Sequence, residues 1–594
     1  MAFSSGVKLG DLDDFIGLSQ ECVKPLIEAA DGASAKLFSV SEAKAVPVAE
    51  VPLVQRPNLI KSKQSGADPK AQIGQVTLSD CLACSGCVTS AETVLLQEQS
   101  GEEFLKRTSS SALTVVSISA EARTSLASSS GESPLLAMQR AAEGLRQLGV
   151  SYVLDCSAAE ALALLEGKAE FVNRFRNASS GGSSSSKSKA HVQASNGGAL
   201  PLLTSHCPGW TLYAEKVVDP VVLPHLAPLR PPQQVQGRLV KTCLLESHNR
   251  RRFHRWWRAR SPLFASQHLL IRPLVEALAP GPKPLGPADV YHVSVQPCYD
   301  RKIEAARPSF EVPGEDGVKE VDTVLTATEL RDLVLGTSTG CCGSEEACQA
   351  SGLQDLIACP LDSQVLTDVF LGSLEAPGRP QPLICAVRGN AGSGGFMEHV
   401  FRESARELFQ IDLPASALEF KTKQNEDMRE LTLTNPQTQK ILLRFTAAYG
   451  FRNIQNVIRR VSKASLGSDS PHFVEIMACP GGCLNGSGLI PDDRQKAESS
   501  NQTARRQRLD GLEDILVNSP GTAQVAPADH PLVLPLYRYI LSRSAEAGSK
   551  TVDAASLESM VGSKAARAFL FAEWRSLKVD SEGKDVVGTS ALKW

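Results

Sequence analysis

The 594-residue chain lacks three features that would direct it to a membrane or to nucleic acid. Its formal net charge is only −3, so no overall electrostatic field attracts it to nucleic acid or to anionic lipids. It has no uninterrupted apolar stretch long enough to cross a bilayer. The opening MAFSSGVKLGDLDDF lacks the basic and then apolar segments of a secretory signal, and its acidic residues are untypical of a mitochondrial leader. We therefore expect a cytoplasmic protein without membrane contact, with the nucleus as a second candidate compartment.

A phosphate-binding loop of the form GxxxxGK[ST] is also missing, which argues against nucleotide hydrolysis by this chain. The 42% of hydrophobic and 21% of charged residues are an ordinary globular balance, and the length suits two to four domains. What the chain does contain is 15 cysteines. Because thiols stay reduced in the cytosol and nucleus, we interpret these cysteines as metal ligands and buried thiols rather than disulfides.

Short apolar runs rich in β-branched residues alternate with helical stretches from about residue 110 onward. The runs are far enough apart for helical crossovers, which predicts an α/β fold with parallel sheets flanked by helices. Helices are expected at 133–149, where apolar residues recur at intervals of three and four, and at 451–464. The predicted strands are 113–119, 152–155, 200–205, 290–295, 323–327, 382–388, 443–450 and 473–478.

Composition divides the chain into three parts: a cysteine-bearing N-terminal segment (1–105), an α/β core (106–500), and a C-terminal helical segment with a tail (501–594). Stretches rich in Ser and Gly, in Pro, or in small polar residues cannot bury a core, and they predict insertions or linkers. In this core they lie near 177–198, 221–260 and 336–352.

The second of these stretches ends in the basic and aromatic run HNRRRFHRWWRAR (248–260). Arginine interleaved with aromatic rings suits phosphates and bases, so a nucleic-acid patch is one interpretation. The other is a solvated helix face that docks on its own domain. We favour the second, because a charge run alone carries no groove-reading geometry, and we expect no direct nucleic-acid partner.

A set of four cysteines lies in the C-terminal two-thirds of the chain: Cys207, Cys298, Cys479 and Cys483. The first three each come directly after, or within two residues of, an apolar, strand-like run. Strand ends of parallel sheets converge on a crevice, so distant cysteines at such ends can meet at one point. Pro480-Gly481-Gly482 allows a tight turn between the last two, with backbone N–H groups free to approach a cluster. Buried structural thiols and a zinc site are the alternatives, but structural zinc usually takes paired knuckles rather than single ligand segments.

A second set begins with the run CLACSGC, which contains Cys81, Cys84 and Cys87. The CxxCxxC spacing is the compact part of many [4Fe–4S] binding runs, whose fourth ligand lies elsewhere in the chain. Cys22 is the only cysteine upstream of the run and is the natural fourth ligand. Closing the intervening loop is tolerable because loop entropy grows slowly with length. Zinc is the competing metal here as well.

Several motifs together resemble the iron-only hydrogenase large-subunit family. They are TSHCPGW (204–210), QPCYDRKIEAAR (296–307), DTVLTATEL (322–330), SGGFMEHV (393–400) and EIMACPGGCLNGSG (475–488). The opening GVKLGDLDDFIGLSQECVKP, the CLACSGC run and AYGFRNIQNV are similar to its eukaryotic hydrogenase-like branch, the cytosolic iron–sulfur protein assembly factors related to the nuclear prelamin A recognition factor.

The resemblance implies a two-lobed α/β core and two [4Fe–4S] clusters. One cluster would be held by Cys22, Cys81, Cys84 and Cys87, and the other by Cys207, Cys298, Cys479 and Cys483. It also implies a non-enzymatic adaptor that links an early scaffold complex of P-loop NTPases to a late targeting complex of WD40-propeller and HEAT-repeat components. That targeting complex passes clusters to cytosolic and nuclear apoproteins.

Three residues depart from the hydrogenase pattern. His206 stands where hydrogenases carry a proton-relay cysteine, and Gln296 and Arg301 replace the Met and Lys of their second motif. The missing thiol argues against hydrogen chemistry and favours the assembly branch. A hydrogenase-related redox enzyme and a zinc-stabilised interaction protein remain the alternative functions.

The last segment, DSEGKDVVGTSALKW, looks polar and mobile and carries Trp594. An aromatic residue on such a tail is untypical of a core, although docking on its own domain is an alternative. In this family an aromatic tail resembles the short peptide by which clients and adaptors engage the targeting complex. Trp594 would then insert its ring into a pocket of that partner.

Overall fold

The structure is a computed structural model that describes residues 99–180, 199–260, 281–338, 384–387, 395–414, 418–462, 470–491, 502–519, 522–544 and 555–575. Chain contacts divide the protein into two units, Met1–Gly86 and Cys87–Trp594, and all described residues belong to the second. The predicted N-terminal ligands and the predicted tail residue therefore lie outside the described residues; these are Cys22, Cys81, Cys84, Cys87 and Trp594.

One sheet of four parallel strands has the order β2-β1-β4-β5. Its strands are β1 (Leu113–Ile118), β2 (Tyr152–Asp155), β4 (Val290–Gln296) and β5 (Thr323–Thr326). All six residues of β1 and all seven of β4 are buried, as expected for parallel strands covered on both faces. All four strands were predicted from their apolar runs, and their parallel pairing is confirmed.

A second sheet of five strands has the order β3-β10-β9-β8-β7 and is mixed. The strands β3 (Leu202–Thr204), β10 (Phe473–Met477) and β9 (Ile441–Tyr449) are parallel, as predicted. The strands β8 (Met428–Thr434) and β7 (Lys421–Thr422) add antiparallel pairs at one edge. The prediction missed this edge. The turn that builds it begins at Asn435, whose side-chain oxygen accepts hydrogen bonds from the backbone N–H groups of Gln437 and Thr438 (2.9 and 3.1 Å).

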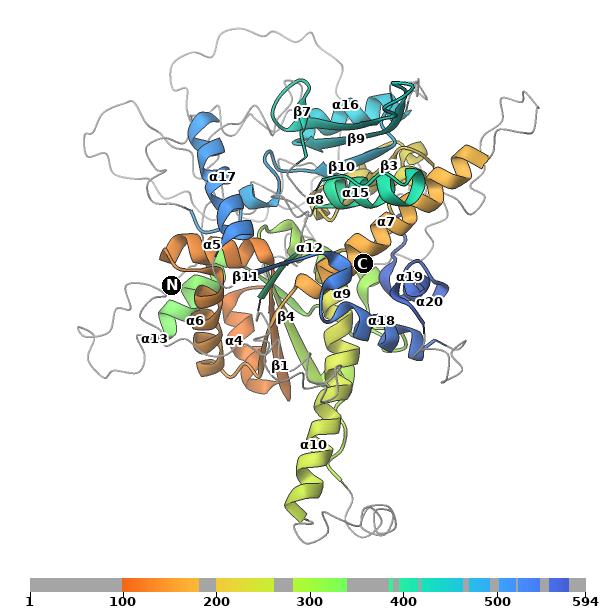
Figure 1. The fold of residues 1–594 in the computed structure, drawn as a ribbon. Helices are drawn as coiled ribbons and strands as arrows, with labels where there is room; N and C mark the ends of the chain where they lie inside the picture. The colour runs from red at the N-terminus through yellow and green to blue at the C-terminus, as the bar shows by residue number, and fades with distance from the viewer. Residues whose placement is uncertain are drawn as a thin grey trace, which may run out of the picture. The chain divides into compact units, whose positions relative to one another are not determined.

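Helices surround both sheets (Figure 1). The predicted helices are confirmed as α6 (Pro134–Gln147) and α16 (Phe451–Ser462). Ser133 caps α6 by accepting a hydrogen bond from Leu136 N (3.3 Å). The others are α4 (Gly101–Ser110), α5 (Ala120–Ser130), α7 (Ser157–Ser180), α8 (Pro208–Lys216), η3 (Pro220–His225), α9 (Pro232–Leu239), η4 (Val240–Leu244), α10 (Leu245–Arg260), η5 (Pro287–Asp289), α12 (Asp300–Ala306), η6 (Pro308–Phe310), α13 (Ala327–Ser338), α15 (Phe396–Phe409), η8 (Cys483–Asn485), α17 (Gln502–Asn518), η10 (Pro527–Asp529), α18 (Val533–Ser542), α19 (Leu557–Met560) and α20 (Lys564–Leu570).

Each sheet has its own apolar core. Leu145 of α6 and Leu330 of α13 belong to the core cluster of the first sheet. On the second sheet, the ring of Phe171 in α7 packs edge-on against Phe445 and Phe473, with ring centroids 4.9 and 5.7 Å apart. A further parallel pair, β6 (Ile384–Val387) with β11 (Thr522–Val525), joins distant parts of the chain.

The Pro-rich stretch at 221–237 is not the linker that its composition predicted. Residues 220–225 form η3, and 232–239 form α9, in which Gln234 and Val235 are fully buried. Prolines are compatible with a helix at its first turn, and α9 begins at Pro232. The N-terminal boundary predicted near 105 is also wrong in detail, because it falls inside α4.

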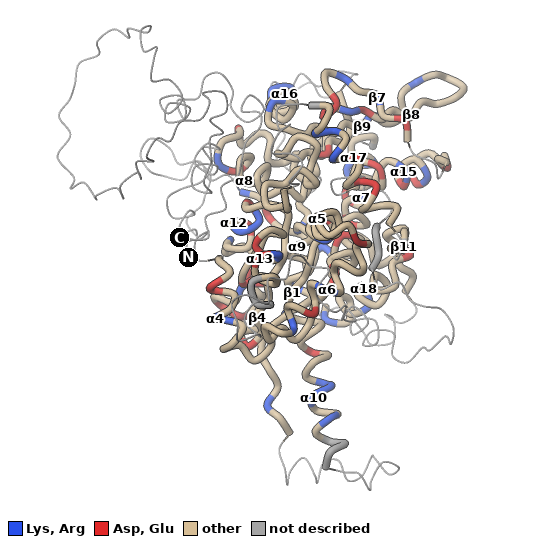
Figure 2. The backbone as a smooth tube through the Cα atoms, turned by 90° about the vertical axis from the view of Figure 1, so that its left-hand side faces the viewer, with Lys and Arg blue, Asp and Glu red and all other residues tan. Residues whose placement is uncertain are grey.

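The basic run 248–260 continues this ordered segment as part of α10 (Figure 2). The ring of Phe253 lies 5.6 Å from that of Trp256, and a Cβ on Gly281 would lie 3.0 Å from Phe253. The chain that returns after the run therefore packs on its aromatic side. No helix in the part of the chain that the structure describes is long and apolar enough to span a membrane.

Candidate metal centre

The four cysteines of the predicted C-terminal set line one small cavity. They lie after the ends of three strands, of which β3 and β10 belong to the five-stranded sheet and β4 belongs to the four-stranded sheet. Cys207 follows β3 and is the N-cap of α8, and Cys298 follows β4. Cys479 and Cys483 follow β10, and Cys483 begins η8. The two sheets thus bring together residues almost 280 positions apart, and the convergence expected at strand ends is found here.

Backbone contacts fix the loops that carry the sulfurs. The hydroxyl of Ser205 accepts a hydrogen bond from Cys207 N (2.9 Å) and donates one to Ile476 O (2.5 Å). This ties the end of β3 to β10. The N–H of Ala478 donates to the Cys207 sulfur (3.5 Å). Such N–H groups stabilise a thiolate and tune the potential of a cluster bound to it.

The turn between Cys479 and Cys483 depends on glycine. Gly481 and Gly482 have φ values of 73° and 80°, a backbone region that side chains with a Cβ rarely adopt. Asp427 holds the turn, because its carboxylate accepts a hydrogen bond from Gly481 N (2.6 Å). The sequence reasoning missed Asp427, since it precedes β8 on the antiparallel edge that was not predicted and carries no motif.

The chemistry of the donor set fits an iron–sulfur cluster. Cys207, Cys298 and Cys483 are buried, and burial raises the pKa of each thiol above its ordinary value. A positively charged metal core would lower these pKa values and hold the sulfurs as thiolates. Four sulfur donors around one point select soft sites, either iron–sulfur or zinc.

Other cysteines stay apart from this set. Cys156 and Cys243 are buried, and Cys385 lies in β6. Cys156 is only 3% exposed, which places its thiol in the core. Cys341, Cys342, Cys348 and Cys359 lie outside the described residues.

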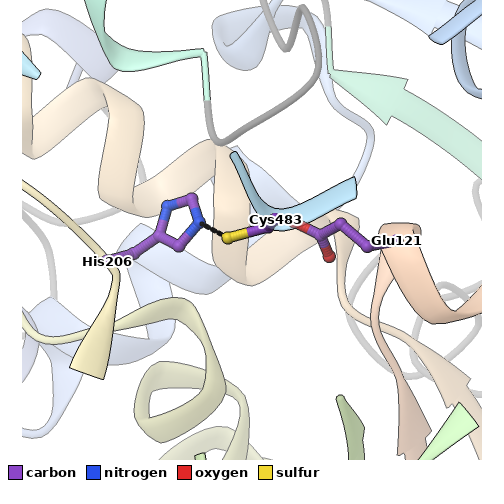
Figure 3. Close-up of side chains that lie close together, drawn as sticks. All are labelled: Glu121, His206 and Cys483. Carbon is purple, nitrogen blue, oxygen red and sulfur yellow. Dashed lines mark hydrogen bonds between the residues drawn. The ribbon is translucent and has the colours of Figure 1, made fainter. Parts of the chain in front are cut away.

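Two further side chains lie beside Cys483 (Figure 3). The Nε2 atom of His206 is 3.4 Å from the Cys483 sulfur, and Glu121, in the first turn of α5, lies on the other side of that sulfur. Burial and the nearby Arg301 lower the pKa of His206 to about 3, so its imidazole is neutral at physiological pH. The sequence had singled out His206 only as a departure from a motif, and Glu121 carried no signal.

The sequence matches the family described as the iron-only hydrogenase large subunit, C-terminal domain, over residues 112–254 and 276–487, more than half of the chain. The chain belongs to this family. All four cysteines of the cavity lie inside the matched residues, and the family predicted from the cysteine motifs is confirmed.

Relatives of similar length share about a third of their residues with this chain. "Cytosolic iron-sulfur assembly component 3" of Mus musculus is 36% identical over 547 residues, which cover 91% of this chain and 93% of the mouse protein. "Protein NAR1" of Arabidopsis thaliana is 35% identical over 494 residues, which cover 82% and 84% of the two chains. The chain therefore lies in the branch that contains these proteins.

Among solved structures, an apo [FeFe]-hydrogenase HydA1 variant from Chlamydomonas reinhardtii is similar in fold. The TM-score is 0.53 at 19% identity, and the match covers 82% of this chain and 99% of the hydrogenase. Together with the sheets and helices described above, this likeness confirms the predicted hydrogenase-like α/β fold.

Proposed function

We propose that this protein is a component of cytosolic iron–sulfur protein assembly. It is not an enzyme, and it carries a [4Fe–4S] cluster on Cys207, Cys298, Cys479 and Cys483. The observation that carries the proposal is the cavity that all four cysteines line. The printed names of relatives matched over 91% of the chain support the pathway.

The second [4Fe–4S] cluster of the proposal is held by Cys22, Cys81, Cys84 and Cys87, for which the CxxCxxC spacing is the support. The protein then links an early P-loop NTPase scaffold to a late targeting complex, with Trp594 as the contact to the targeting complex. Its clients are apo iron–sulfur proteins of the cytoplasm and nucleus.

A hydrogenase-related redox enzyme is the competing function. An imidazole, that of His206, stands where the resemblance to hydrogenases places a relay thiol, and its Nε2 faces the Cys483 sulfur at 3.4 Å. This substitution favours assembly over hydrogen chemistry.

Anaerobic purification with metal and sulfide analysis tests the proposal. Two four-cysteine sites should hold about eight iron and about eight sulfide per chain, with electron paramagnetic resonance signals of reduced [4Fe–4S] centres. Stoichiometric zinc with little iron would overturn it in favour of a zinc-stabilised protein. Iron with hydrogen turnover would overturn it in favour of an enzyme.

A further inference from the structure

Three side chains of types that bind metals lie close together, each from a different part of the fold (Figure 3). One of them, Cys483, also lines the four-cysteine cavity. They are Glu121 of α5, His206 after β3 and Cys483 of η8. One carboxylate oxygen, one imidazole nitrogen and the sulfur all lie within 4.8 Å of one another. All three residues are at most 9% exposed.

The distance between sulfur and nitrogen fits joint coordination of one ion. Zinc–sulfur and zinc–nitrogen bonds at a tetrahedral angle put the two donor atoms about 3.6 Å apart. In the structure the Cys483 sulfur and His206 Nε2 are 3.4 Å apart. A small movement of the Glu121 carboxylate would complete a three-donor face.

The surroundings leave room for a fourth ligand. Glu121 and His206 also line a second cavity of about 30 Å³, enough for a water molecule, whereas Cys483 lines the first. The three donors thus stand at the boundary between the two cavities. The second cavity is lined by polar side chains, among them Gln233 and Gln296, that could hold a water molecule on the ion.

The charges of the donor atoms suit a divalent ion. One carboxylate and one thiolate neutralise the charge of a divalent ion. The buried guanidinium of Arg301, which lines the second cavity, forms an ion pair with Glu304 (3.1 Å).

We propose that the protein, before its inner cluster is loaded, binds a single divalent transition-metal ion, zinc or ferrous iron, through Glu121, His206 and Cys483. Binding replaces the Cys483 thiol proton, which leaves to solvent. Because Cys483 also belongs to the four-cysteine set, the ion and the cluster compete for its sulfur, a consequence that rests on the proposed function.

Cobalt(II) is a suitable probe, because its absorption reports thiolate ligands and coordination geometry. The full-length chain would carry serine at Cys22, Cys81, Cys84, Cys87, Cys207, Cys298 and Cys479, so that neither four-cysteine set can bind metal. We expect this protein to bind one cobalt ion with a spectrum of a single thiolate and four-coordinate geometry. Circular dichroism first establishes that it is folded.

Adding Glu121→Gln, His206→Gln or Cys483→Ser should each weaken cobalt binding on the order of 100-fold or more, since even changes in residues that only support a ligand cost about 10- to 100-fold. Glu166→Gln and His530→Gln are matched controls, because both residues are buried, line neither cavity, and contact Tyr537 and Ser157 instead. Unchanged cobalt affinity in Glu121→Gln and His206→Gln would overturn the proposal.

A second arm separates this inference from the proposed function. With all cysteines present, Glu121→Gln and His206→Gln should still acquire about eight iron per chain. Loss of the inner cluster in these variants would mean that Glu121 and His206 only support the cluster ligands. That result would contradict the proposal of a separate ion site. The wild-type chain could acquire no cluster while cobalt binding still depends on Glu121 and His206. In that case the proposed function is wrong and the proposed ion site is still supported.

Discussion

A Cβ atom on Gly486 would lie 2.4 Å from the carbonyl oxygen of Pro297. This close approach joins the loop that follows Cys483 to the residue that precedes Cys298. Gly488 N strengthens the contact with a hydrogen bond to the same carbonyl oxygen (2.8 Å). The sulfurs of Cys298 and Cys483 can line one cavity because the backbones of their two loops are in contact. Only glycine, which has no Cβ, allows this close approach at position 486.

Gly486→Ala should therefore push the two loops apart and lower retention of the inner cluster. We expect the iron content to fall by about half, because one of the two proposed four-iron sites would be lost. Gly511→Ala in α17 is the matched control, because a Cβ there meets nothing within 4 Å and alanine gains up to about 1 kcal/mol in a helix. Equal iron contents in the two variants would show that the loop contact does not shape the site.

Serine substitutions should separate the two clusters. Cys84→Ser should remove about four iron and leave the fold as stable as before, whereas Cys483→Ser should remove about four iron and lower the melting temperature. The difference follows because the inner ligands come from three strand ends of the core. Cys243→Ser replaces a buried thiol outside the cavity and should keep its full iron content. Iron analysis and thermal unfolding under anaerobic conditions provide both readouts.

Hydrogen should be neither produced nor consumed. With a strong chemical reductant, the anaerobic protein should evolve no more hydrogen than a control with free iron–sulfur cluster. The reason is that position 206 carries a histidine and not a thiol that could relay protons. His206→Cys should not be sufficient to create activity. Gas chromatography checks both proteins, and sustained turnover by the wild-type chain would refute the assignment as a non-enzyme.

Removing Trp594 should abolish co-purification with the targeting complex while leaving the iron content and melting temperature unchanged. The physical reason is that a single aromatic ring, seated in a partner pocket, can carry much of the binding energy of a short peptide. Lys593→Ala, which keeps the ring, is the matched control and should retain binding. Unchanged affinity after the removal would move the interface to the folded core.

Acid should weaken the fold through His292 of β4. Its ring is fully buried between Ser117 Oγ (2.9 Å) and Glu320 O (3.0 Å), and burial lowers its pKa to about 4. Below the unfolded pKa of about 6.5 the unfolded chain binds a proton that the folded chain excludes, so stability falls as the pH drops toward 4. From pH 7 to pH 5 this loss is about 2 kcal/mol.

Urea unfolding at pH 7 and pH 5 checks this prediction. His292→Gln should lose about 2 kcal/mol less than the wild-type chain between the two pH values. His254→Gln on the exposed side of α10 should show the wild-type pH dependence. The same pH dependence in His292→Gln and wild type would mean that His292 is not held neutral in the fold.

Much of the fold could be predicted from local patterns. The apolar runs at 113–119 and 290–295 became β1 and β4, because a run of β-branched residues favours a buried strand wherever it pairs. The prediction from composition was wrong at 221–237, where the prolines suggested a linker and the structure has helices. Proline excludes a helix interior but not its first turn, and whether the following turns are buried depends on neighbours far away in the sequence.

The sequence alone determined the family and the four cysteines after strand ends, because ligand type, glycine turns and strand propensity are local properties. Only the tertiary structure decided that Cys207, Cys298, Cys479 and Cys483 line one cavity, and that Glu121 and His206 stand beside Cys483. Those contacts join segments of the chain that lie between 85 and 362 positions apart. Their distances depend on how two sheets pack, and packing is a sum over the whole core that no local pattern contains.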